Sequence, residues 1–140
     1  MRTITVSEVM TSRVVSVRDD ASVSNIDWEM TLAEVRHIPV IDERGGVVGI
    51  VSDRDLLRAN TRADRDRLPV ATIMTLSPYT VRADSAVRDA VEQMLARKIN
   101  ALPVVDADDR LVGILTATDV LELTHRALCG LPIDAPRVTA

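Results

Sequence analysis

The chain contains an internal repeat with one fixed offset. Met10-Thr11 recurs as Met74-Thr75, 64 positions later, and no gap interrupts the register. The same offset joins Val17-Arg18 to Val81-Arg82, Pro39-Val40 to Pro103-Val104, Val48-Gly49-Ile50 to Val112-Gly113-Ile114, and Asp55 to Asp119. A period this long with only two copies is typical of a duplicated unit rather than of a solenoid. The sequence therefore predicts two similar units related by a pseudo-twofold axis.

Each copy predicts the same order of elements, β-α-β-β-α, and hence an α/β (α+β) fold. Short β-branched or apolar runs predict the strands. They lie at 13–17, 38–41 and 47–51 in the first copy and at 79–81, 102–105 and 111–115 in the second. Apolar residues at helical spacing predict helices after Asp20 and Asp84, and further helices open at Ser52 and Thr116. The chain is expected to consist of a first repeat at 7–58, a polar linker at 59–69, a second repeat at 70–128 and a tail at 129–140.

Composition argues against several classes of protein. The net charge of -4 and an aromatic content of 1% do not suit a general nucleic-acid binder. One cysteine and two histidines predict neither a disulfide framework nor a metal site. With no apolar run of about 18 residues and no signal-peptide core, we expect a cytoplasmic protein without a membrane segment. The sequence also lacks a nucleophile paired with a base, so we expect no enzyme.

The segments 49–55 and 113–119 carry the most informative chemistry. A glycine inside each predicted strand indicates that backbone or ligand approaches closely there. Ser52 and Thr116 stand where strand gives way to helix, with an aspartate three residues later, which is the pattern of a capping box. One interpretation is a structural cap alone. The other is a nucleotide site, because a helix N-terminus favours phosphate and a carboxylate one turn in can accept both hydroxyls of a ribose.

The repeated motifs resemble the CBS domain (cystathionine β-synthase type), here as a tandem pair, or Bateman module. The resemblance rests on Met-Thr before a Val-rich strand, a helix ending in Met, hydrophobic-Pro-Val-hydrophobic-Asp and Gly-Ile-x-Ser/Thr-x-x-Asp, over about residues 7–126. It implies two repeats packed through their sheets, with two symmetry-related clefts. Such clefts often bind adenosine-containing regulatory ligands such as AMP, ADP, ATP or S-adenosylmethionine, and no cofactor is required. The target protein is not implied.

The resemblance also implies a role for individual residues. Asp55 and Asp119 would hold ribose, and Ser52 and Thr116 would contact phosphate. Tyr79 would stack on adenine, or else lie as a partly exposed aromatic of its strand. The remaining residues expected near the base are Ile38, Pro39, Leu102, Pro103 and Val15.

The two copies differ beside these motifs. The first has Arg36-His37 and Asp53-Arg54 where the second has Asn100-Ala101 and Ala117-Thr118. The extra cationic groups, Arg54 and His37, predict that the first copy is the better phosphate site, although Asp53 works against this.

Trp28 points to a partner surface. It falls about 140° from Val23 on its helix and lies away from the Ile26 and Met30 stripe. The last helix, at 120–128, is also apolar on more than one face. We expect a homodimer. The alternative function is a ligand-independent dimerisation or interaction scaffold in which both motifs act only as helix caps.

Overall fold

The computed structural model describes residues 2–64 and 66–133, and the predicted tail beyond 133 lies outside them. The first elements are α1 (Val6–Val9), β1 (Val17–Arg18), α2 (Val23–Ala33), β2 (His37–Ile41), β3 (Val47–Ser52) and α3 (Asp53–Ala59). The next are η1 (Val70–Thr72), β4 (Thr75–Leu76), β5 (Val81–Arg82), α4 (Val87–Arg97), β6 (Ala101–Val105), β7 (Leu111–Thr116) and α5 (Ala117–Leu128). The predicted β-α-β-β-α order is present in both repeats.

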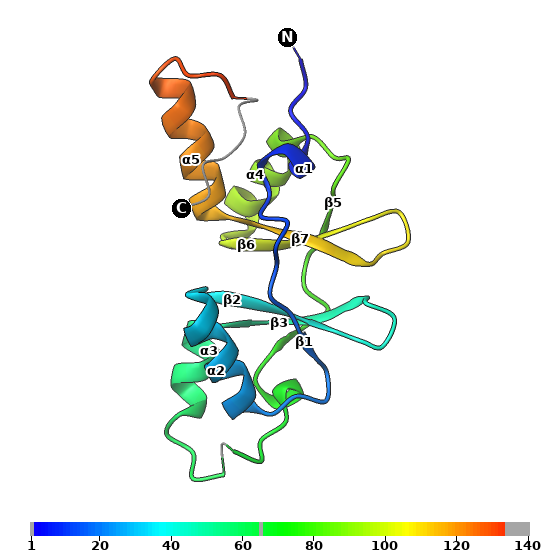
Figure 1. Ribbon diagram of the computed structural model, residues 1–140, viewed down its shortest axis with the longest axis vertical. Helices are drawn as coiled ribbons and strands as arrows, with labels where there is room; N and C mark the ends of the chain where they lie inside the picture. The colour runs from blue at the N-terminus through cyan, green and yellow to red at the C-terminus, as the bar shows by residue number, and fades with distance from the viewer. Residues whose placement is uncertain (1, 65, 134–140) are drawn as a thin grey trace.

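The described strands form two sheets, ordered β1-β2-β3-β4 and β5-β6-β7. In each sheet a first short strand runs parallel to the next, and the following two strands form an antiparallel hairpin. The sheets face each other in the middle of the molecule, and the helices cover their outer sides (Figure 1). The structure confirms a mixed α/β fold in which two repeats pack through their sheets.

The strands predicted at 13–17 and 79–81 are shorter than expected. Only Val17 and Arg18 reach β2, where they pair with Val40 and Ile41. In the second repeat the equivalent strand, β5, is again two residues long. The residues before each strand cross from one repeat to the other, so they have no neighbouring strand to pair with.

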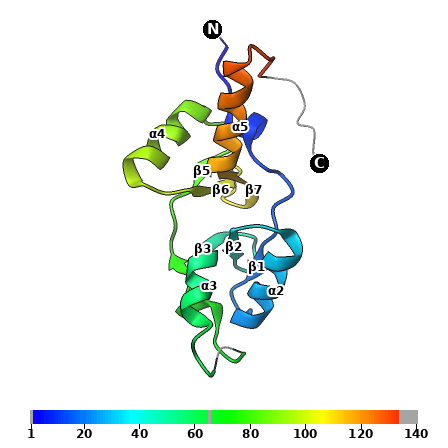
Figure 2. The ribbon, with the colours of Figure 1, turned by 90° about the vertical axis from the view of Figure 1, so that its left-hand side faces the viewer.

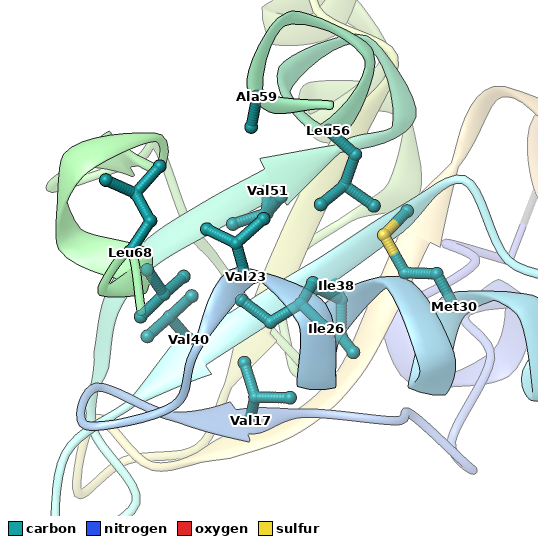
Figure 3. Close-up of a cluster of buried hydrophobic side chains, with 11 residues drawn as sticks. Val17, Val23, Ile26, Met30, Ile38, Val40, Val51, Leu56, Ala59 and Leu68 are labelled. Carbon is teal, nitrogen blue, oxygen red and sulfur yellow. The ribbon is translucent and has the colours of Figure 1, made fainter. Parts of the chain in front are cut away.

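A hydrophobic core lies between the sheet and the helices of each repeat. In the first repeat, side chains from α2 meet side chains from β1, β2 and β3 (Figure 3). The buried members are Val17, Val23, Ile26, Met30, Ile38, Val40, Val51, Leu56, Ala59, Leu68 and Val70. The second core repeats this pattern with Val81, Val87, Ala90, Met94, Leu102, Val104 and Leu115, and adds Val6 and Val9.

The cores are completed by exchanged segments. Residues 4–11 lie at the start of the first repeat and residues 68–75 at the start of the second, and both are called the opening segments below. Each opening segment packs on the other repeat. The first is fastened to the second repeat, where the amide of Val6 donates to the carbonyl of Ser85 at 2.8 Å. The second is fastened to the first repeat through β4, which pairs with β3. Each core therefore depends on both halves of the chain.

The strand glycines make room for these segments. A Cβ placed at Gly49 would lie 2.4 Å from the Sδ of Met74, and one at Gly113 would lie 2.5 Å from the Sδ of Met10. Both distances are too short for a methyl group to fit. The predicted close approach is confirmed, and the approaching group is a methionine of the chain itself.

Candidate functional site

Both Ser/Thr-x-x-Asp motifs border one cleft of about 970 Å³ between the repeats. Figure 2 looks onto this side of the molecule, with α5 starting above the middle and α3 below it. The cleft is lined by 34–37 and 52–54 from the first repeat, by Asn100, 116–119, Leu121 and Glu122 from the second, and by Thr11.

The motifs fold as the capping boxes predicted from their spacing. Oδ2 of Asp55 accepts hydrogen bonds from the amide of Ser52 at 2.8 Å and from its hydroxyl at 3.0 Å. Oδ2 of Asp119 accepts the same pair of bonds from Thr116, at 2.8 and 3.1 Å. The cap thus uses one oxygen of each carboxylate. Oδ1 is the oxygen that a ligand would meet.

The two carboxylates differ in solvent exposure and in their hydrogen bonds. Oδ1 of Asp119 accepts a hydrogen bond from the hydroxyl of Thr11 at 3.1 Å. Asp119 is only 4% exposed, whereas Asp55 is half-buried.

The helix N-termini differ in charge. At α3, Oδ1 of Asp53 accepts from the amide of Arg54 at 2.9 Å, so a carboxylate already occupies this end of the helix. At α5 the equivalent residue is Ala117, which has no acceptor for the amide of Thr118. Asp53 therefore adds a negative charge at the start of α3 that α5 lacks, while Arg54 beside it adds a positive charge.

His37 does not supply the predicted cation. Burial lowers the pKa of His37 below its usual value, and the neighbouring Arg36 lowers it further. The carboxylates of Asp53 and Asp55 act in the opposite direction but do not outweigh burial. His37 is therefore neutral at pH 7, and it lines the cleft as a polar, uncharged side chain.

The residues expected around adenine do not line the cleft. Ile38 and Leu102 are fully buried in the two cores. Val15 is half-buried against the first core. The guanidinium of Arg97 instead lies over the ring of Tyr79, with Cζ 3.7 Å from the ring centroid. Pro39 and Pro103 are also fully buried.

Of the predicted site residues, the cleft brings together Ser52, Arg54, His37, Thr116 and Asp119. Asp55 is linked to it through the capping bond to Ser52.

The cleft residues that were not predicted as site residues include Thr11, Val35 and Leu121. Val35 and Leu121 are exposed and give the cleft an apolar surface. The one sequence signal for Leu121 is its place on a helix that is apolar on more than one face. The sequence gives no such signal for Thr11, because Thr11 reaches the cleft only through the exchange of the opening segments.

Among the described residues, no three His, Cys, Asp or Glu side chains are grouped so that they could hold a metal ion. Sγ of Cys129 lies 3.5 Å from Nε2 of His125 near the end of α5, as an isolated exposed pair. Within residues 2–64 and 66–133, every helix is too short or too polar to cross a membrane.

Comparison with known proteins matches both repeats to one family. The CBS domain model matches residues 6–62 and 70–126. Homoserine O-acetyltransferase of Methanococcoides burtonii is 34% identical over 118 residues, which is 84% of this chain but 24% of that protein. This chain thus spans about a quarter of that relative. A CBS domain-containing protein of Dictyostelium discoideum is 28% identical, over 92% of this chain and 97% of its own length.

Solved structures give the same result. CBSX2 of Arabidopsis thaliana, solved in complex with AMP, is 34% identical with a TM-score of 0.78, covering 89% of this chain and 98% of CBSX2. The CBS domain pair of protein MJ0100, in complex with 5′-methylthioadenosine and S-adenosyl-L-methionine, is 25% identical with a TM-score of 0.81, covering 90% and 99%. With both repeats matched by the family model and the whole fold shared with CBS domain pairs, this chain belongs to the CBS-domain family.

Proposed function

We propose that the chain is a non-catalytic regulatory module that binds an adenosine-containing ligand between its two CBS domains. The observation that carries the proposal is the cleft of about 970 Å³, bordered by both Ser/Thr-x-x-Asp helix starts. Small-molecule sites commonly enclose about 300–1,000 Å³. The complexes of CBSX2 with AMP and of the MJ0100 pair with two adenosine compounds support the ligand class.

The contacts of the cleft suggest how such a ligand lies. Phosphate would bind at the start of α5, where the amide of Thr118 follows Ala117 and not an aspartate. Ribose would meet Asp119. The base would lie against Val35 and Leu121, the exposed apolar residues of the cleft.

Thermal unfolding with added nucleotides tests this function. AMP, ATP and S-adenosylmethionine are each added to the protein, with GMP as a control of the same charge as AMP. A ligand at 100 times its dissociation constant stabilises the fold by about 2.7 kcal/mol. We expect a rise in Tm with at least one adenosine compound and a smaller rise with GMP. Unchanged Tm with all adenosine compounds at millimolar concentration would favour the second candidate.

That second candidate is a ligand-independent interaction scaffold. It is favoured by the capping boxes, in which the hydroxyls and carboxylates of both motifs are already hydrogen-bonded within the chain. Either function is compatible with a homodimer, which we propose forms through the face of α2 that carries Trp28 and Leu32. Both side chains are 63% exposed, one turn apart on the helix. Exposed apolar surface of this kind marks an interface.

Light scattering tests the dimer. The wild type is expected at about twice 15.3 kDa, because a twofold axis would place this face against its own copy. Trp28→Glu would bury a charge in that interface and yield a monomer. Leu76→Glu is the matched control, since Leu76 is 70% exposed on β4 and away from α2. A monomeric wild type, or a Trp28→Glu variant that stays dimeric, contradicts the proposed face.

A further inference from the structure

We infer that Thr11 sets the affinity of the second motif, because its hydroxyl competes with the ligand for Asp119. The inference rests on the proposed function and specifies how that site is regulated. Oδ1 of Asp119 accepts from the hydroxyl of Thr11 at 3.1 Å, and Oδ2 is held by Thr116. Thr11, Thr116 and Asp119 all line the cleft.

The hydrogen bond covers the carboxylate. Asp119 is 4% exposed, and the hydroxyl of Thr11 occupies a hydrogen-bonding position at Oδ1 that a ribose hydroxyl would need. The hydroxyls of a ribose are the same kind of donor as the hydroxyl of Thr11. Binding therefore replaces the hydrogen bond from Thr11 by one from the ribose. The free energy of the lost bond reduces the free energy of binding.

The backbone of Thr11 is held separately from its side chain. Its amide donates to the carbonyl of Ile114 at 2.9 Å, and its carbonyl accepts from the amide of Ile114 at 2.9 Å. These bonds keep the opening segment beside the cleft whichever way the hydroxyl points. A rotation about one side-chain bond is thus enough to break the hydrogen bond between Thr11 and Asp119, and the fold does not have to open.

The first motif offers a built-in control. Thr75 occupies the position equivalent to Thr11 and pairs with Ile50. Thr75 is exposed, and in the described part of the chain no hydrogen bond joins its side chain to Asp55. Competition of this kind therefore acts on the second motif alone.

Calorimetric titration with AMP tests the inference. Measurements are made in an Asp55→Ala background, so that the second motif dominates binding. Thr11→Val keeps the branched shape and removes the hydroxyl, and we expect the affinity for AMP to rise about tenfold. Thr11→Ser restores a hydroxyl and is expected to return the affinity toward that of the background. Thr75→Val is expected to leave it unchanged.

The outcomes separate this inference from the proposed function. Thermal unfolding verifies that each variant is folded, and Thr11→Ala replaces Thr11→Val if the latter is not. If AMP binds but Thr11→Val leaves its affinity unchanged or weakens it, Thr11 does not compete and the inference is wrong while the function stands. If none of AMP, ATP and S-adenosylmethionine binds any of the proteins, including the wild type, both are overturned.

Discussion

Gly113→Ala is expected to lower the free energy of unfolding by about 3 kcal/mol, near the upper end for an overpacked site. The added methyl group would lie 2.5 Å from the Sδ of Met10 and 2.9 Å from the carbonyl oxygen of Thr11. The thioether can rotate aside. The carbonyl cannot, because it accepts the backbone hydrogen bond from Ile114. Relief of the contact therefore requires the first opening segment to move off the second repeat.

Gly49→Ala is the matched control for this prediction. All three atoms that its methyl group would approach most closely belong to the side chain of Met74, with Sδ at 2.4 Å. A methionine side chain repacks more easily than a backbone. Chemical denaturation of both variants should therefore show a larger loss of stability for Gly113→Ala. Equal losses would mean that the contacts with the methionine side chains alone determine the loss of stability.

Asp119→Ala is the second large effect, because it should reduce both stability and nucleotide affinity. The substitution removes the acceptor for the amide and hydroxyl of Thr116 and for the hydroxyl of Thr11. Hydrogen bonds to a buried charged group are worth about 1.5–3 kcal/mol each, and leaving donors unpaired adds a penalty. We expect a loss of about 3 kcal/mol in the free energy of unfolding. AMP affinity at the second motif should fall more than tenfold.

Two further variants separate the cap from the ligand site. Asp55→Ala removes a half-buried carboxylate that accepts hydrogen bonds from Ser52 alone within the described part of the chain, so the loss of stability should be smaller. Asp119→Asn retains an acceptor for the cap but not the charge. Compared with Asp119→Ala, it should restore more of the stability than of the affinity for AMP. If Asp119→Ala lowers stability while AMP binds as before, the second motif is a helix cap only.

The sequence was sufficient to predict much of this architecture. The 64-residue offset predicted two units, and the spacing of Ser52 and Thr116 from their aspartates predicted the capping boxes. Both features are local, or follow from similarity between the two copies. The glycine at each strand likewise predicted close contact, since only a missing side chain leaves that space.

The lining of the cleft could not be predicted in the same way. Met10-Thr11 and Met74-Thr75 have the same sequence, so the repeat pattern does not indicate on which repeat each of them packs. The hydrogen bond between Thr11 and Asp119 depends on that choice. Ile38 and Leu102 were expected near the base, yet strand alternation turns them into the cores. Asp53 carries a charge whose effect on α3 depends on its side-chain orientation, which the pattern does not specify.

The exchanged opening segments make the two repeats interdependent in folding. A cut in the linker before Leu68 would separate the first core from Leu68 and Val70, and the second core from Val6 and Val9. Neither fragment would contain a complete core, although each would contain nearly all of one repeat. Unfolding of one half would withdraw a segment from the other, so both halves should melt in a single cooperative transition. The chain would then behave in solution as one thermodynamic unit, and split fragments would recover the fold only by associating with each other.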